Sequence, residues 1–325
     1  MDSLRLGRQT LGYVVSLALL IGLAAILAGC GGAGTTASVP PALTQSAAHH
    51  ATSSSGDLLY VTTDGLGTLQ VLSYPALQVV ETLSSVGFSA GASNLSNGDV
   101  CLSNNIIESY HHGAKSPFET LKPPGTLTDE TSFTDCAFDP TTGNAAGSLW
   151  NEEECCEPVV AVYKSPSNPV LYSDPNMAWA SFLAYDNTGN LFFDGVGVNY
   201  QYMLDELPKG SSKPIELAIN KQIGPMLSLA WDGEYITVMD SSTIYRLSVS
   251  GSTATVVGHT TLEKLPKGHY SNAYEIVDGV VIGIAKYGRG SYLALWHYPS
   301  GGKPYEHIHE RRLNGTVLSV APTHK

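Results

Sequence analysis

Three observations in the sequence predict an all-β fold, a six-bladed β-propeller with four-stranded antiparallel blades. Helical periodicity is almost absent, and short runs rich in Val, Ile, Tyr, Thr and Leu alternate with Gly, Pro, Asn and Asp turns. One glycine turn recurs at intervals of 42, 45, 46, 44 and 46 residues, the spacing of propeller blades. The two ends of the repeat region supply complementary parts of one blade. The recurring glycines are Gly56, Gly98, Gly143, Gly189, Gly233 and Gly279.

Each repeat is expected to place strands before and after its glycine turn. The strands before the turn include residues 133–139, 181–186 and 227–232. A later strand in each repeat closes on a small-residue or proline turn. Examples of this later strand are residues 71–75, 107–113, 160–165 and 295–301. The predicted unit is therefore strand, Asp-x-x-Gly turn, strand, loop, strand, Gly or Pro turn, strand.

The ends of the repeat region predict how the ring closes. No strand precedes the turn at Gly56, whereas residues 315–322 form a leading strand with no repeat after it. Together they complete one blade, so N-terminal and C-terminal strands are expected to pair and remove the exposed sheet edges of an open array. Five full repeats and this composite blade make six.

The N-terminus has the three zones of an export signal. Arg5 and Arg8 precede an apolar run over residues 11–27, and small residues follow it. The exit Leu27-Ala28-Gly29-Cys30 resembles the lipobox of bacterial lipoproteins, which implies cleavage after residue 29 and acylation of Cys30. An uncleaved membrane anchor is the alternative, because the run is just long enough to span a bilayer.

The lipobox resemblance divides the chain into three parts. Residues 1–29 are expected to be the signal peptide, residues 30–55 a lipidated, flexible tether, and residues 56–325 the propeller. We expect an exported protein, held to the cell envelope by its lipid, with the propeller on the extracytoplasmic side. Removal of residues 1–29 leaves 15 basic and 28 acidic residues, a net charge of −13. This charge argues against nucleic acid and anionic lipid surfaces as partners.

Apart from Cys30, the chain contains four cysteines, an even number that predicts disulfides in an exported protein. Cys101 and Cys136 lie in strands of neighbouring blades, so we expect them to pair. Cys155 and Cys156 are adjacent and would then form a strained vicinal bond. The alternative for this second pair is a soft-metal or redox loop, although the nearby carboxylates disfavour a reactive thiolate.

The repeats resemble uncharacterised exported six-bladed bacterial propellers related to NHL-repeat and gluconolactonase-type proteins. The resemblance covers about residues 56–325 and rests on segments such as residues 172–176, 206–212 and 231–233. Gluconolactonase-type enzymes hold a divalent metal at one mouth of the channel with Glu, Asn and Asp side chains from different blades. The resemblance therefore implies a metal site as one alternative for this chain.

Four residues at strand ends are candidates for that site. The candidate ligands are Asp64, Asn104 or Asn105, Asp194 and Asp240. Because alternate strands of a blade are antiparallel, these ends lie at one face of the ring and could converge on a Ca²⁺-type ion. Asn and Asp are also common where strands enter loops, because their side chains bond local backbone groups. Both interpretations are open at this point.

The remaining signals favour recognition over catalysis. His307 and His309 would share one face of an outer strand, where the solvated interpretation competes with metal binding. We expect a monomeric binding or scaffolding module with a protein or small molecule at one face; the alternative is a metal-dependent lactonase or similar hydrolase. Aromatic residues that could line a face are Trp150, Tyr200, Tyr202 and Tyr287.

Overall fold

The fold is described from a computed structural model of the chain. The described residues are 56–63, 68–84, 96–103, 105–125, 131–150, 159–224, 228–263, 269–287, 290–310 and 317–321. The chain divides into two units, Met1–Ala47 and Ala48–Lys325, and every described residue belongs to the second. The expected signal peptide, Cys30 and tether lie outside the described residues. Within the described ranges no helix has the length and apolarity needed to cross a bilayer.

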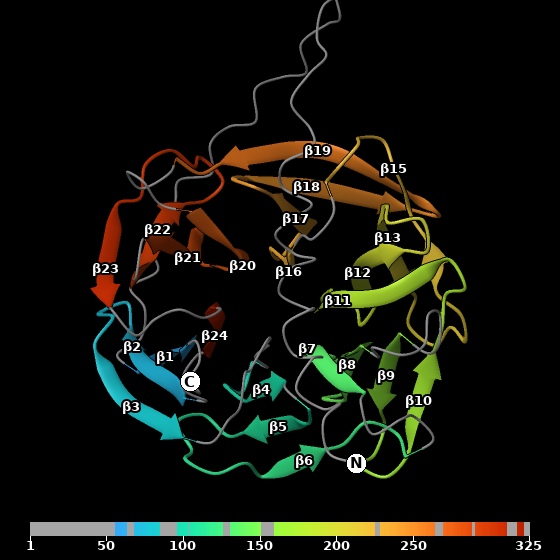
Figure 1. The fold of residues 1–325 in the computed structure, drawn as a ribbon, viewed down its shortest axis with the longest axis horizontal. Helices are drawn as coiled ribbons and strands as arrows, with labels where there is room; N and C mark the ends of the chain where they lie inside the picture. Colours follow the sequence, from blue (N-terminus) through green and yellow to red (C-terminus); the bar gives the residue numbers. More distant parts are fainter. Residues whose placement is uncertain are drawn as a thin grey trace, which may run out of the picture. The chain divides into compact units, whose positions relative to one another are not determined.

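The described residues form six small sheets arranged around a ring, which confirms the six-bladed β-propeller (Figure 1). We number the blades 1 to 6 in chain order and give the strands of each from the ring centre outward. Blade 1 contains β24 (Val317–Ala321), β1 (Asp57–Thr63), β2 (Thr68–Tyr74) and β3 (Val79–Ser84). Blade 2 contains β4 (Val100–Ser103), β5 (Ile107–Tyr110) and β6 (Glu119–Leu121). Blade 3 contains β7 (Ser132–Phe138), β8 (Ala145–Trp150), β9 (Val160–Tyr163) and β10 (Pro169–Tyr172).

The second half of the ring is built in the same way. Blade 4 contains β11 (Met177–Tyr185), β12 (Leu191–Gly197), β13 (Tyr202–Leu207) and β14 (Ile215–Glu216). Blade 5 contains β16 (Ser228–Trp231), β17 (Ile236–Asp240), β18 (Thr243–Ser250), β19 (Thr253–Thr261) and β15 (Ala218–Ile219). Blade 6 contains β20 (His269–Val277), β21 (Val280–Tyr287), β22 (Gly290–His297) and β23 (Glu306–Glu310). His307 lies on the outermost strand of blade 6 and is exposed, as the solvated interpretation predicts.

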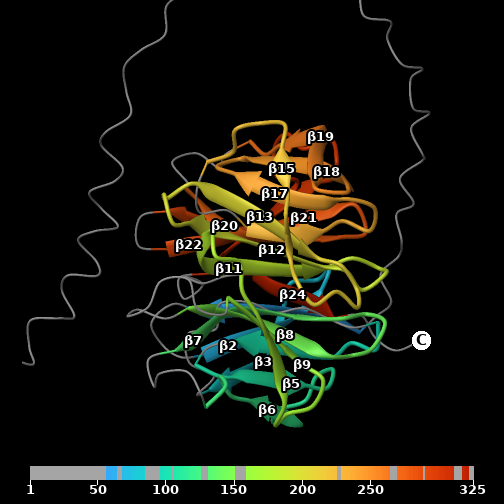
Figure 2. The same ribbon diagram turned by 90° about the vertical axis from the view of Figure 1, so that its right-hand side faces the viewer.

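Two blades depart from the expected four strands. Blade 5 gains β15, which runs parallel to the outer strand β19, because the chain leaving blade 4 follows the edge of blade 5 (Figure 2). Blade 2 shows three strands in the described part of the chain, and residues 85–95, ahead of its glycine turn, lie outside it.

Ring closure follows the prediction. Strand β24 pairs antiparallel with β1, with Leu59 opposite Val320 and Tyr60 opposite Ser319. The C-terminal strand thus forms the inner edge of blade 1, and β1 is covered on both sides by β24 and β2. Pairing of the two ends removes the open edge that β1 would otherwise present.

The hydrophobic core is divided among the blade boundaries, because each sheet buries both of its faces. Alternate residues of one strand serve two boundaries. On β12, Phe193 packs against blade 3 with Val160, while its neighbour Phe192 packs against blade 5 with Ile236. Each fully buried Phe, Val or Ile contributes about 1.5–3 kcal/mol to folding. The blade boundaries, rather than one central core, therefore hold the ring together.

The glycines of the recurring turn share a positive φ, although Gly56 is much more extended than the other five. These φ values lie in a region that other residues rarely adopt: Gly56 (152°), Gly98 (81°), Gly143 (76°), Gly189 (89°), Gly233 (99°) and Gly279 (76°). In blades 3, 4 and 5 an aspartate carboxylate accepts the backbone N–H two residues later, from Asp139, Asp186 and Asp232 respectively. This local hydrogen bond explains the aspartate ahead of the turn, which precedes its glycine by four residues in blade 3, by three in blade 4 and by one in blade 5, so the expected Asp-x-x-Gly spacing holds in blade 4 of these three.

A disulfide joins Cys101 on β4 to Cys136 on β7, 35 residues apart in sequence. Both cysteines are buried in the cluster between blades 2 and 3, next to Ile107 and Phe133. The bond therefore links neighbouring blades. Cys155 and Cys156 lie outside the described residues.

Candidate functional site

Of the four candidate metal ligands, Asp194 and Asp240 lie among the described residues. Asp194 lies in the middle of β12 and is 1% exposed, whereas Asp240 ends β17 and is partly exposed. Asp64 and Asn104 lie outside the described residues, and Asn105, the alternative to Asn104, is exposed. Among the residues that are described, no group of three His, Cys, Asp or Glu side chains is arranged to hold a metal ion.

An irregularity in β11 explains the position of Asp194. The pairing of β11 with β12 shifts register between Ala180 and Leu183. Phe182 lies in this irregular stretch, and its N–H donates to Asp194 Oδ1 at 3.0 Å. The hydroxyl of Tyr202 donates to the other oxygen of Asp194 at 3.4 Å. The carboxylate thus satisfies backbone and side-chain donors inside the blade.

A second aspartate uses the same irregular strand from the neighbouring blade. The N–H of Leu183 donates to Asp135 Oδ2 at 2.7 Å, and the N–H of Cys136 donates to Asp135 Oδ1 at 2.8 Å. Asp135 lies on β7, so this contact connects blade 3 to blade 4. Strand β7 is also irregular here, because its register with β8 shifts between Phe133 and Asp135.

Asp135, Asp194 and Glu275 form an interior acidic group near the ring centre. Burial raises the pKa of Asp135 to about 8, although hydrogen bonds from Leu183 and Cys136 oppose this shift. Burial, followed by the charge of Asp135, raises the pKa of Glu275 to about 8. Burial also holds the pKa of Asp194 well above its usual range. Because Glu275 and Asp135 belong to opposite blades, their interaction places both near the ring axis.

This interior acidic group is arranged to connect inner strands. The carboxylates of Asp135 and Asp194 already accept backbone N–H groups, which is the role that turn and strand-end aspartates often have. Asp194 is among the residues expected from the sequence, whereas Asp135 and Glu275 are not. No spacing signal marks those two residues, because each stands within a strand and becomes significant only when the ring brings blades 3 and 6 together.

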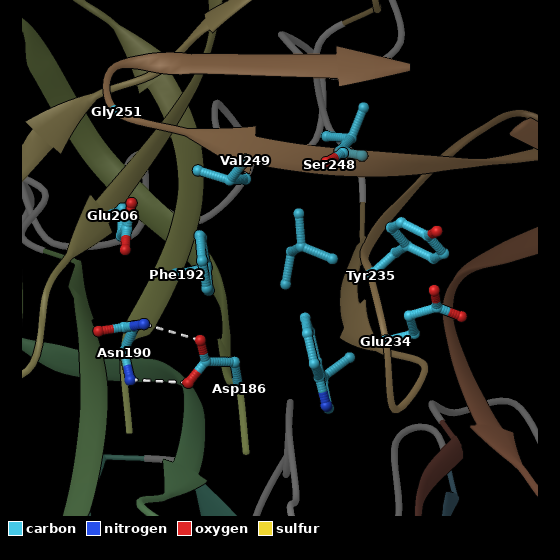
Figure 3. A pocket seen from close by; sticks show the side chains of 12 residues that line it. Asp186, Asn190, Phe192, Glu206, Glu234, Tyr235, Ser248, Val249 and Gly251 are labelled. Atoms are coloured by element: carbon cyan, nitrogen blue, oxygen red, sulfur yellow. Dashed lines mark hydrogen bonds between the residues drawn. The ribbon is translucent and has the colours of Figure 1, made fainter. Parts of the chain in front are cut away.

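A pocket of about 270 Å³ lies between blades 4 and 5, beside the glycine turns of both blades (Figure 3). Its lining combines acidic side chains, aromatic rings and aliphatic residues. The acidic and aromatic members are Asp186, Glu206, Glu234, Phe192, Trp231 and Tyr235. Figure 3 shows Asp186, Phe192 and Glu206 on the blade 4 side, facing Glu234 and Tyr235 on the blade 5 side. Carboxylates and ring faces therefore surround one space.

The carboxylates of this pocket differ in their hydrogen bonding. The carboxylate of Asp186 accepts hydrogen bonds from the backbone and side chains of Thr188 and Asn190, so both of its oxygens already have donors within the turn. The carboxylate of Glu206 accepts no hydrogen bond from any described residue. Burial, followed by the charge of Asp186, raises the pKa of Glu206. Glu206 is therefore the carboxylate that a positively charged ligand would stabilise most.

One aromatic ring of the pocket is held in place by its neighbours. The indole N–H of Trp231 donates to Asn187 Oδ1 at 3.1 Å, across the boundary between blades 5 and 4. Asn187 Nδ2 in turn donates to the carbonyl of Gly233. Since these bonds fix the indole, its orientation does not depend on a ligand.

A second hollow, of about 410 Å³, lies between β13 and the segment that leads to blade 5. Tyr200, one of the aromatics expected at a face, lines it and is 77% exposed, with a φ of 62°. Trp150 is also exposed, whereas Tyr202 lies mostly inside the blade. The side chain of Tyr287 lies outside the described set. The expectation of exposed aromatics thus holds for Tyr200 and Trp150.

Comparisons with known proteins support the fold. No family model matches the chain. No curated protein matches it either. A protein of unknown function from Bacteroides caccae is similar in structure, with a TM-score of 0.59 and 11% identity, over 83% of this chain and 100% of that chain. The likeness is one of fold.

Two further solved structures show the same architecture. The β-propeller domain of Myceliophteria thermophila Cps50 (Swd1) has a TM-score of 0.52 and 12% identity, over 79% of this chain and 83% of that domain. A functionally unknown protein from Desulfotomaculum acetoxidans has a TM-score of 0.51 and 11% identity, over 82% of this chain and 100% of that chain. At these identities the comparisons carry no function, and they do not single out the NHL-repeat or gluconolactonase-type relation.

Proposed function

We propose that the propeller is a binding module and that the pocket between blades 4 and 5 takes a small cationic group, such as a primary amine or a quaternary ammonium. The observation that carries this proposal is the carboxylate of Glu206, which is partly buried beside aromatic rings and has no hydrogen-bond donor among the described residues. A cation replaces the hydration that burial has removed from this carboxylate.

The aromatic rings support the same ligand class. Ring faces attract ammonium groups, by about 0.5–2 kcal/mol each depending on how far the cation is desolvated. Trp231 and Tyr235 are partly exposed at the pocket, and Trp231 is fixed by its bond to Asn187. The acidic net charge of the chain, −12, also favours the approach of cations over anions.

The N-terminal sequence adds a cellular location to this function. We propose that the chain is exported and held to the cell envelope by a lipid on Cys30, with the propeller presented outside the cytoplasm. The pocket would then meet extracytoplasmic amines or basic peptide side chains. This part rests on the lipobox-like residues 27–30. Mass spectrometry of the membrane-extracted protein tests it, because an unmodified Cys30 or an intact residue 1–29 segment contradicts it.

The binding proposal is tested by calorimetry of the purified protein with tetramethylammonium and with its uncharged analogue, neopentyl alcohol. We expect binding of the cation and none of the alcohol. The variant Glu206→Gln should weaken binding about tenfold or more, since a charge-assisted contact contributes about 1.5–3 kcal/mol. The matched control is Glu263→Gln, because Glu263 is exposed and does not line the pocket.

The pH dependence supplies a second readout. Binding should weaken as the pH falls, because protonation removes the charge of Glu206, and burial places this protonation above the ordinary range for a glutamate. Equal affinities for the cation and the alcohol, or an unchanged affinity in Glu206→Gln, would overturn the proposal.

A further inference from the structure

Asp205 is a buried carboxylate without a hydrogen-bond donor. It lies on β13, is 0% exposed, and neither of its side-chain oxygens has a hydrogen-bond partner among the described residues. Its neighbours two positions away, Met203 and Leu207, belong to the apolar cluster between blades 3 and 4. Because side chains alternate along a strand, Asp205 points to this same boundary. An ionised carboxylate in such surroundings needs a positive partner.

The polar neighbours of Asp205 are other carboxylates. The carboxyl group of Asp174, in the turn between β10 and β11, lies close enough to share a proton with it. Asp174 is itself buried, with 6% exposure. Glu216 pairs with Asp205 across β13 and β14, so their side chains lie on the same face of the sheet. Burial, then Asp174, then Glu216 raises the pKa of Asp205 to about 9.

Asn176 ties the two sides of this group together. Its backbone N–H donates to Asp174 Oδ1 at 2.6 Å, and its side-chain Nδ2 donates to Glu216 Oε2 at 3.2 Å. Asn176 and Glu216 are both exposed, so the buried pair of aspartates opens to solvent on their side. The segment before β11 and the outer strand β14 are thus held around two buried carboxylates.

We propose that Asp174 and Asp205 bind a calcium ion at the boundary between blades 3 and 4, with Glu216 and Asn176 on its solvent side. The donors are oxygens, which suit a hard cation, and no cysteine or histidine is among them. Calcium accepts an irregular set of carboxylate and water oxygens, whereas magnesium requires near-octahedral geometry. As no three carboxylates in the described structure are already in metal-binding geometry, water completes the coordination and Glu216 acts through it.

This site is independent of the pocket proposed above. It lies at the other boundary of blade 4, and its role is to join the turn after β10 to β13. It also differs from the metal site considered from the sequence, which contains Asp194 and Asp240. The experiment must therefore separate three locations: the Asp174–Asp205 pair, the pocket with Glu206, and the sequence-derived set.

The test is calorimetry and thermal unfolding of the purified protein, after chelation and after addition of calcium. We expect one calcium ion bound per chain and a midpoint raised by several degrees. Asp205→Asn should abolish both effects, and Asp174→Asn should weaken binding at least tenfold. The matched control Glu263→Gln, with its exposed side chain, should bind calcium as the wild type does.

The variants also show whether a loss of binding is only a loss of folding. In the chelated state at pH 8, Asp205→Asn should melt at a higher temperature than the wild type, because the wild-type carboxyl, with its pKa raised to about 9, must take up a proton on folding, whereas the amide need not. Three results would overturn the proposal. The first is no response of the wild type to calcium. The second is calcium binding that is lost in Asp194→Asn but kept in Asp205→Asn. The third is calcium binding that is lost in Glu206→Gln alone.

Discussion

The carboxylate of Asp135 in blade 3 accepts the backbone N–H of Leu183 in blade 4 at 2.7 Å, and both groups are buried. The same carboxylate accepts the N–H of Cys136 at 2.8 Å. One side chain therefore serves donors on two inner strands. Both β7 and β11 shift register here, and each presents one N–H group to this side chain. A carboxylate suits this position because it has two oxygens that can accept them.

Asp135→Ala should lower the free energy of unfolding at pH 4 by about 1–3 kcal/mol, because two buried N–H groups lose their acceptor and the raised pKa of Asp135 costs little stability at this pH. Asp135→Asn should lower it less, since its amide oxygen still accepts one of them. Urea unfolding measures both effects, and Glu263→Ala is the control at an exposed position. Midpoints that are the same in the alanine variant and the control would contradict this role.

The interior acidic group predicts that stability falls as the pH rises. The pKa values of Asp135 and Glu275 are raised to about 8 in the folded state, from ordinary values of 3.8 and 4.5. Between those limits the folded chain binds more protons than the unfolded chain, so the free energy of unfolding decreases with increasing pH.

Glu275→Gln should flatten this dependence, because the amide cannot ionise. The measurement is the urea midpoint at pH 5 and at pH 9, with Glu306→Gln on the exposed part of β23 as the control. The wild type and the control should lose more stability over this range than the Glu275 variant. Parallel pH profiles for all three proteins would show that Glu275 ionises normally.

Gly195 follows Asp194 on β12 and permits the close approach of β11. A Cβ at this position would stand 2.1 Å from the carbonyl oxygen of Trp179. Gly195→Ala should therefore destabilise the fold by at least about 2 kcal/mol, because backbone atoms must move. Gly125→Ala is the matched control, since no atom lies within 4 Å of its Cβ. Equal thermal midpoints for the two variants would exclude this close approach.

The Cys101–Cys136 disulfide closes a loop of 35 residues in sequence separation. Loop-closure entropy predicts a stabilisation of about 3–4 kcal/mol for this length. A strong reductant, or the paired substitution Cys101→Ala and Cys136→Ala, should lower the free energy of unfolding by a similar amount, measured from the urea midpoint. Reductant should have no further effect on this double variant unless Cys155 and Cys156 contribute, so the same titration also tests the second cysteine pair.

The sequence contained enough information for the architecture of the ring. The glycine turns repeat because each needs a positive φ, and a residue with one special backbone conformation leaves a periodic trace. Closure by β24 could be inferred because the strand at residues 317–321 has no other partner in the repeat count. Both features are local, or depend only on counting repeats.

The candidate sites were much less visible in the sequence. Asp135 and Asp205 stand in strands, where an aspartate resembles any outward-facing polar residue. Asp135 becomes important because β11 pairs irregularly with its neighbour. Asp205 becomes important because the fold brings it close to Asp174, which is far from it in sequence. Glu206 lies in a repeat segment, and nothing in the sequence marks it as a pocket residue, because its aromatic neighbours Trp231 and Tyr235 come from the next blade.

Blade 1 takes β24 from one end of the propeller sequence and β1 from the other. During synthesis β1 is made before the other described strands of the ring, and β24 is made after them. One edge of β1 therefore stays unpaired while the other blades form. An unpaired edge is a template for pairing with a second chain. The nascent protein is thus most prone to aggregate at β1, until residues 317–321 pair with this strand.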